Sequence, residues 1–130
     1  MAAISELKIL LVDDQKGIRD LARLALEEAG VTHILEAKNG EEALGVVRSE
    51  AIDLVISDWN MQPLDGLELL KAIRADEAIK KTPFIMMTGT FEDEDVKAVK
   101  KAGVDSYVKK PFDANTVKEK IEQVVGPLDG

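Results

Sequence analysis

Five short apolar runs, rich in Val, Ile, Leu and Met, alternate with longer segments that carry apolar residues at helical spacing. Runs of this length are typical of strands that are buried on both faces of a parallel sheet. Their alternation with helical segments predicts an α/β fold, a doubly wound five-stranded parallel sheet with five helices on its two faces. The strands are predicted at 8–12, 34–37, 54–57, 84–87 and 104–108.

Polar residues mark where several of the helices begin. Asn39 and Asp65 each stand three residues before a glutamate, which is the pattern of a capping box. Asp113 is predicted to cap the last helix, and Asp14 could cap the first in the same way. The tail, 128–130, is expected to be frayed.

The 130 residues predict a single domain, 1–130, with its core at about 8–125. No apolar stretch approaches the ~18–20 residues of a membrane span, and the start of the chain lacks a secretory signal. Without cysteine there is no disulfide and no thiolate metal site. The net charge of −8 argues against nucleic-acid binding. These features predict a cytoplasmic protein that binds neither membrane nor nucleic acid.

Polar side chains follow four of the predicted strands. They are Asp13, Asp14, Asp58, Thr88 and Lys110. A lone aspartate after a strand is more often a turn or cap residue than a nucleophile. Parallel strands, however, share one carboxyl edge, and ligands bind beyond that edge in open α/β sheets. The joint occurrence of these residues therefore favours a functional site.

The residue types at this edge are typical of phosphoryl transfer. Three carboxylates repel one another unless one is protonated or a cation lies between them. Mg²⁺ suits an all-oxygen site, and with one histidine and no cysteine zinc is disfavoured. Asp13 and Asp14 would hold the metal, Asp58 would be the acceptor nucleophile, and Lys110 would bind a phosphoryl oxygen. Thr88 would donate its hydroxyl to the anion. No G-x-G-x-x-G, P-loop or nucleophile-elbow motif is present.

Several stretches, taken together, resemble the receiver domain of two-component response regulators, specifically the CheY-like chemotaxis type. The stretches are Asp13-Asp14, 57–61, Asp65-Gly66, Thr88 and 107–112, and the resemblance extends from Lys8 to about Val125. It implies the flavodoxin-like fold with strand order 2-1-3-4-5.

The resemblance also implies a role for each site residue. Asp58 would accept a phosphoryl group from a histidine kinase, and Asp13, Asp14 and Asp58 would bind Mg²⁺ together with the backbone carbonyl of Asn60. Lys110 would pair with Asp58 or with its phosphoryl group.

A conformational switch is implied as well. Phosphorylation would draw Thr88 inward and let the ring of Tyr107 follow, and Pro111 would be preceded by a cis bond. The face formed by the fourth helix, fifth strand and fifth helix would then bind a downstream protein, such as a flagellar motor switch. The output would be protein binding rather than catalysis beyond the chain's own phosphotransfer and autodephosphorylation. We expect a monomer, with dimerisation on phosphorylation as an alternative.

Two other functions are compatible with the same residues. One is a stand-alone phosphorelay receiver outside chemotaxis. The other is a Mg²⁺-dependent phosphatase with an aspartyl-phosphate intermediate, although such an enzyme wants a second carboxylate where this chain has Asn60. A receiver-like module that is never phosphorylated is disfavoured by the intact acidic residues.

The chain departs from the family pattern at three places. Gln62 stands where proline is usual, and Pro63 follows it. Gly89 stands where alanine is usual, which predicts a looser switch segment and a more open phosphoryl site. Thr90 replaces an acidic residue that the chemotaxis type often has; with Asn60 it flanks the route of an attacking water and would modulate the phosphoryl lifetime.

Overall fold

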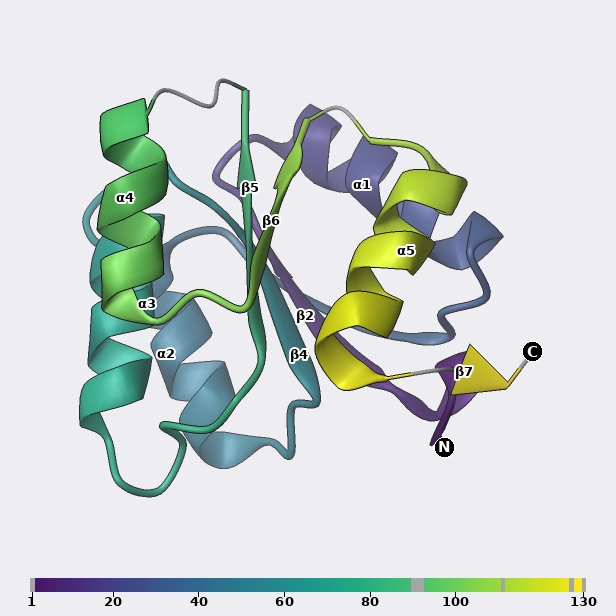
Figure 1. Ribbon diagram of the computed structural model, residues 1–130, viewed down its shortest axis with the longest axis horizontal. Coiled ribbons are helices and arrows are strands. Elements are labelled where there is room, and N and C mark those ends of the chain that lie inside the picture. The colour runs from purple at the N-terminus through teal and green to yellow at the C-terminus, as the bar shows by residue number, and fades with distance from the viewer. Residues whose placement is uncertain (1, 90–92, 111, 127, 130) are drawn as a thin grey trace.

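The computed structural model describes residues 2–89, 93–110, 112–126 and 128–129. Its centre is a parallel sheet in the order β3-β2-β4-β5-β6 (Figure 1). Counted along the chain, the strands of this sheet lie in the order 2-1-3-4-5, which confirms the flavodoxin-like topology. The strands are β2 (Lys8–Val12), β3 (His33–Ala37), β4 (Leu54–Asp58), β5 (Phe84–Thr88) and β6 (Ser106–Lys109).

Five α-helices cover the two faces of the sheet, as predicted (Figure 1). One face carries α1 and α5, and the other carries α2, α3 and α4. The helices are α1 (Lys16–Glu28), α2 (Gly40–Ser49), α3 (Gly66–Ala75), α4 (Asp93–Ala102) and α5 (Ala114–Val125). A 3₁₀ turn, η1 (Ile4–Glu6), precedes β2. Within the described ranges, no helix has both the length and the apolar character needed to cross a bilayer.

Successive side chains of the central strands pack into two separate cores. On β2, Ile9 and Leu11 belong to the core beneath α1 and α5, whereas Leu10 and Val12 belong to the core beneath α2 and α3. Side chains alternate between the two faces of a strand, so a strand covered on both faces needs apolar residues at every position. This explains why the sequence shows continuous apolar runs.

Side-chain caps begin three of the helices where the sequence predicted them. The carboxylate or amide oxygen of Asn39, Asp65 and Asp113 accepts a hydrogen bond of 2.8 Å from the backbone N–H three residues on. Asp65 forms the complete capping box. Asp14 does not cap α1, because the residue at the N-cap position is Gln15, whose side chain makes no capping hydrogen bond.

The ends of the chain differ from the prediction. The tail was expected to be frayed, but β7 (Leu128–Asp129) pairs in parallel with β1 (Ala2–Ala3), and this prediction is therefore wrong. The pairing gives hydrogen-bond partners to backbone groups at both ends of the chain. The fifth strand of the main sheet is also shorter than predicted at its start, because it begins at Ser106.

Candidate functional site at the carboxyl edge of the sheet

Asp13 lies directly beyond β2 and is completely buried. Its backbone N–H continues the sheet ladder by donating to the carbonyl oxygen of Ala37 at 3.1 Å. Its Oδ1 accepts a hydrogen bond of 2.9 Å from the backbone N–H of Gln15, a local turn typical of aspartate. The strand end and this turn fix the Asp13 carboxylate at the edge of the sheet.

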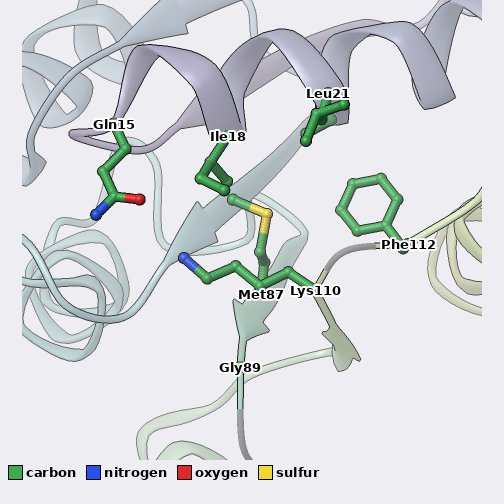
Figure 2. Close-up of a pocket in the computed structure, with 8 residues that line it drawn as sticks. Gln15, Ile18, Leu21, Met87, Gly89, Lys110 and Phe112 are labelled. Carbon is green, nitrogen blue, oxygen red and sulfur yellow. The ribbon is translucent and has the colours of Figure 1, made fainter.

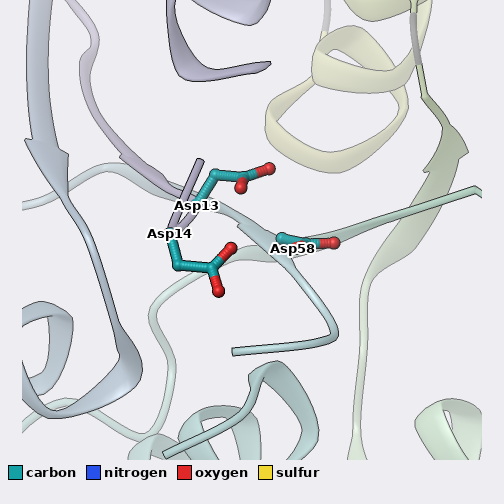
Figure 3. Close-up of side chains that lie close together, drawn as sticks. All are labelled: Asp13, Asp14 and Asp58. Atoms are coloured by element: carbon teal, nitrogen blue, oxygen red, sulfur yellow. The ribbon is translucent and has the colours of Figure 1, made fainter. Parts of the chain in front are cut away.

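Asp58 is the last residue of β4 and is 4% exposed. Carboxylate oxygens of Asp13, Asp14 and Asp58 all lie within 4.8 Å of one another (Figure 3). Asp14 is exposed, whereas the other two are buried. The cluster therefore has a buried floor and one side that is open to solvent.

Lys110 supplies the positive charge of the site. Its Nζ donates to Asp58 Oδ1 at 2.8 Å and to Asp13 Oδ2 at 3.4 Å. Its backbone N–H donates to the carbonyl oxygen of Thr88 at 2.8 Å, which ties the chain beyond β6 to the end of β5. One ammonium thus contacts two of the three carboxylates.

The pKa values of Asp13 and Lys110 reflect this burial and pairing. Burial raises the pKa of the Asp13 carboxyl, and the charge of Asp58 adds to the effect; the Gln15 N–H and Lys110 oppose it without reversing it. Burial alone would lower the pKa of Lys110, but its hydrogen bond to Asp58 and the nearby carboxylate charges raise it above the usual range. The surroundings therefore favour the ammonium form of Lys110, and they make ionisation of Asp13 less favourable than for an exposed aspartate.

The loop after Asp58 is held close to the sheet. The Trp59 N–H donates to Asp58 Oδ1 at 2.9 Å, and the Gly66 N–H donates to the Trp59 carbonyl oxygen at 2.8 Å. A Cβ on Gly66 would collide with the Asp58 carbonyl oxygen. Between these points, the peptide bond from Gln62 to Pro63 is cis.

A hollow of about 220 Å³ opens beside the acidic cluster, and Asp14 and Asn60 lie on its lining together with Met61, Gln62 and Asp65. Its volume leaves room for water molecules or for an anion. The donor set is made of oxygens from three carboxylates, with one carboxylate exposed. Mg²⁺ prefers oxygen ligands and keeps several waters, so these residues fit Mg²⁺.

The two predicted switch residues lie on neighbouring strands. Thr88 ends β5 opposite Lys109, and Tyr107 lies on β6 opposite Met86. Lys120 places its Nζ 5.8 Å from the centre of the Tyr107 ring. Gly89 is exposed and has open space where a Cβ would lie. The predictions for Thr90 and for a cis bond before Pro111 concern residues outside the described ranges.

An apolar cavity of about 190 Å³ adjoins the site on the α1 side (Figure 2). Its lining consists of Gln15, Ile18, Leu21, Ala22, Met87, Gly89, Lys110 and Phe112. Lys110 lines this cavity and also pairs with Asp58, so the cavity and the acidic site share Lys110.

Two residues that contact the acidic loop and strand were given no role on the basis of the sequence. Arg19 donates from Nη1 to the Asp13 carbonyl oxygen at 2.8 Å, and the Ser57 hydroxyl donates to the Asp58 carbonyl oxygen at 2.9 Å. Ser57 could have been noticed as a polar residue inside an apolar strand. Arg19 left no such signal, because an arginine on an amphipathic helix is ordinarily a solvated charge.

Comparison with known proteins agrees with this geometry. The chain is 39% identical over 124 residues to the chemotaxis protein CheY of Pseudomonas aeruginosa, covering 95% of this chain and all of that protein. It is 39% identical over 118 residues to chemotaxis protein CheY-3 of Vibrio cholerae, covering 91% of each. The structure of the chemotaxis response regulator CheY4 of Vibrio cholerae superposes with a TM-score of 0.81 at 32% identity, covering 90% of this chain and 97% of that one. The family described as response regulator receiver domain matches residues 9–122, and the chain belongs to this family.

Proposed function

We propose that the chain is a single-domain response regulator that is phosphorylated on Asp58, with Mg²⁺ held by Asp13, Asp14, Asp58 and the backbone carbonyl of Asn60. Membership of the receiver family makes it a phosphoryl-accepting signalling protein of a two-component phosphorelay, with a histidine kinase as donor and a protein as target. The observation that carries the assignment is the three-carboxylate cluster with Lys110 Nζ 2.8 Å from Asp58.

The proposed reaction transfers a phosphoryl group from an imidazole nitrogen of the kinase to a carboxylate oxygen of Asp58. A carboxylate oxygen of Asp58 attacks the phosphorus of a phosphohistidine whose other ring nitrogen carries a proton; an O–P bond forms, the P–N bond breaks, and its electron pair stays on the ring, which leaves as neutral imidazole. Lys110 then pairs with an oxygen of the transferred group. Bound Mg²⁺ would supply positive charge to the phosphoryl oxygens. Asp13 and Asp58 are preorganised for this by the turn at Gln15 and the hydrogen bond from Trp59.

The apolar cavity beside Lys110 is where we place the histidine kinase. Leu21 lines it and is 56% exposed, so its apolar side chain is accessible to a partner. Any protein that presents a phosphohistidine to Asp58 must reach this edge of the sheet, and the cavity shares Lys110 with the acidic site at that edge. The fitting occupant is a helical segment with apolar residues beside its phosphohistidine.

The output is proposed for the surface around Tyr107 and α5. A hollow of about 430 Å³ lies there, and its lining carries three lysines and one aspartate: Tyr107, Val108, Lys109, Lys110, Phe112, Asp113, Thr116 and Lys120. The basic residues favour an acidic partner segment. The new negative charge on Asp58 would draw the Thr88 hydroxyl toward it and shift the ring of Tyr107, a two-state change biased by a charge-assisted hydrogen bond. The similarity to chemotaxis proteins supports a flagellar motor switch as the target. We further propose a cytoplasmic monomer.

The test of the phosphoacceptor is labelling by a small phosphodonor such as acetyl phosphate. Wild type is expected to take up at most one equivalent in the presence of Mg²⁺ and none after chelation, and Asp58→Asn is expected to take up none. Continued turnover of a phosphate ester beyond one equivalent would point instead to the phosphatase alternative.

Leu21 and Leu24 give a matched test of the kinase surface, because both are exposed on α1 and Leu24 does not belong to the cavity lining. With a kinase that phosphorylates wild type, we expect Leu21→Glu to slow transfer roughly tenfold, a loss of about 1.4 kcal/mol typical of one apolar contact. Leu24→Glu should have a smaller effect. Labelling by acetyl phosphate should be unchanged in both variants; equal slowing by both donors would contradict the proposed surface.

A further inference from the structure

Arg19 joins the edge strand of the sheet to the loop that carries the aspartates. It lies on α1, and its side chain is 16% exposed. Its Nε donates to Glu36 Oε1 on β3 at 3.0 Å. Its Nη1 donates to the backbone carbonyl oxygen of Asp13 at 2.8 Å. One guanidinium therefore bridges a side chain and a main-chain group that are far apart in the sequence.

The hydrogen bond from Arg19 to the Asp13 carbonyl oxygen affects the directions in which the Asp13 and Asp14 carboxylates point. The carbonyl belongs to the planar peptide group that connects Asp13 to Asp14. The N–H of Asp13 is held by the Ala37 carbonyl oxygen, so Arg19 and Ala37 restrain the Asp13 backbone from both sides. Because Arg19 restrains the plane of the peptide between Asp13 and Asp14, it also restrains the position of the Asp14 Cα, from which the Asp14 side chain extends. The relative placement of the two carboxylates therefore depends on this hydrogen bond.

Arg19 forms its ion pair with Glu36, which lies outside the three-carboxylate cluster. Arg23 Nη1 donates to the other oxygen of Glu36, Oε2, at 2.7 Å, and makes this contact independently of Arg19. The hydrogen bond from Nε to Glu36 Oε1 holds the planar guanidinium of Arg19 in an orientation in which Nη1 reaches the Asp13 carbonyl oxygen. A hydrogen bond from a guanidinium is about twice as strong as one between neutral groups. Arg19 thus acts on the acidic site through the backbone and not as a counter-ion to the carboxylates.

We infer that Arg19 is a positioning residue, which sets the Asp13–Asp14 pair in the arrangement that binds Mg²⁺ and admits a phosphoryl group. This inference rests on the proposed function of the acidic site and adds a residue to it. The alternative is that Arg19 has only a structural role, in which it joins α1 to β3 through its ion pair with Glu36. Arg23 provides the matched control, because it binds the same Glu36 carboxylate and makes no hydrogen bond to the Asp13 backbone in the described structure.

The first measurement is a Mg²⁺ titration followed by the fluorescence of Trp59, which neighbours Asp58. Arg19→Ala is expected to raise the Kd for Mg²⁺ about tenfold, in the range found when partners of metal-binding residues are removed. Arg23→Ala is expected to change it less than about twofold. Arg19→Lys can keep one of the two hydrogen bonds and should give an intermediate Kd, and it also serves if Arg19→Ala does not fold.

The second measurement needs no metal and no activity. In Mg²⁺-free protein, the carbonyl ¹³C resonance of Asp13 and the amide resonance of Asp14 should shift in Arg19→Ala and Arg19→Lys, and stay in place in Arg23→Ala. Unchanged resonances, or equal weakening of Mg²⁺ binding in the Arg19 and Arg23 variants, would overturn the inference. A wild-type protein that gives no response to Mg²⁺ would instead overturn the proposed metal site, while the resonances would still decide the backbone contact.

Discussion

At Gly66, the addition of a single methyl group should disturb the acidic site. Gly66 begins α3 and lies against the end of β4, with its N–H bonded to the Trp59 carbonyl oxygen at 2.8 Å. A methyl group at this position would overlap the Asp58 carbonyl oxygen and lie 2.9 Å from Trp59 Cα and 3.0 Å from Met86 Sδ. The first two neighbours are backbone atoms, so Gly66→Ala can be accommodated only if α3 and the end of β4 move apart.

The magnitude follows from two effects. Forcing a methyl group into a packed region costs about 1–3 kcal/mol. Stretching the hydrogen bond to Trp59 removes up to about 0.5–1.5 kcal/mol more. The better helix propensity of alanine, worth up to about 1 kcal/mol in a helix interior, offsets part of this. We expect Gly66→Ala to lower the free energy of unfolding by about 2–3 kcal/mol, or roughly 6–15 °C in Tm for a domain of this size. The Kd for Mg²⁺ should rise too, because Asp58 moves.

Gly45→Ala is the matched control. Gly45 lies inside α2, is exposed, and has no atom within 4 Å of where a Cβ would lie. Here alanine should raise the free energy of unfolding by up to about 1 kcal/mol through helix propensity alone. Urea and thermal denaturation followed by circular dichroism measure both variants. If Gly66→Ala proved as stable as wild type while Gly45→Ala gained stability, the close approach of α3 to Asp58 would not be a constraint on the fold.

Two further predictions concern charge. Because burial and the charge of Asp58 raise the pKa of Asp13, its ionised form opposes folding at neutral pH, so Asp13→Asn should be more stable than wild type in Mg²⁺-free buffer. Its Tm should no longer rise with Mg²⁺, and a lower Tm than wild type would refute the argument. The second concerns Asp113, whose pKa is lowered by the hydrogen bond from the Thr116 N–H. The stabilisation from its ionised form is present above the ordinary value of 3.8 and is lost as the pH falls through the lower folded value. Asp113→Asn keeps a capping oxygen but does not titrate, so its deficit in urea midpoint relative to wild type should shrink between pH 7 and pH 3; a constant deficit would contradict this.

The arrangement of the carboxyl edge could be predicted because it requires little more than strand direction. Once the strands are parallel, residues that follow them must share an edge, whatever the lateral order. This is why Asp13, Asp58 and Lys110 could be grouped before their distances were known. The caps at Asn39, Asp65 and Asp113 were predictable for a similar reason, since their hydrogen bonds span only three residues.

Contacts that depend on how two elements face each other were not predictable. The hydrogen bond from Arg19 to Asp13 requires a particular rotation of α1 about its axis, and the ion pair with Glu36 requires the register of β3 against β2. The pairing of β1 with β7 involves strands of two residues, too short for any alternation to show. In both cases the deciding partner is distant in the sequence and has no periodic pattern.

Asp14 and Asp113 show that an aspartate at this edge of the sheet can either cap a helix or remain available to bind a ligand. Both aspartates lie between a strand and a helix, and either could have been a cap. Asp113 is the N-cap of α5 and accepts from its first turn, whereas α1 begins one residue too late for Asp14 to do so. The Gln15 N–H is instead bonded to Asp13 Oδ1, so the turn is completed from the preceding residue and Asp14 is left exposed beside Asp58. The assignment of Asp14 to a metal site therefore depends on a one-residue difference in where α1 starts, which only the three-dimensional structure supplies.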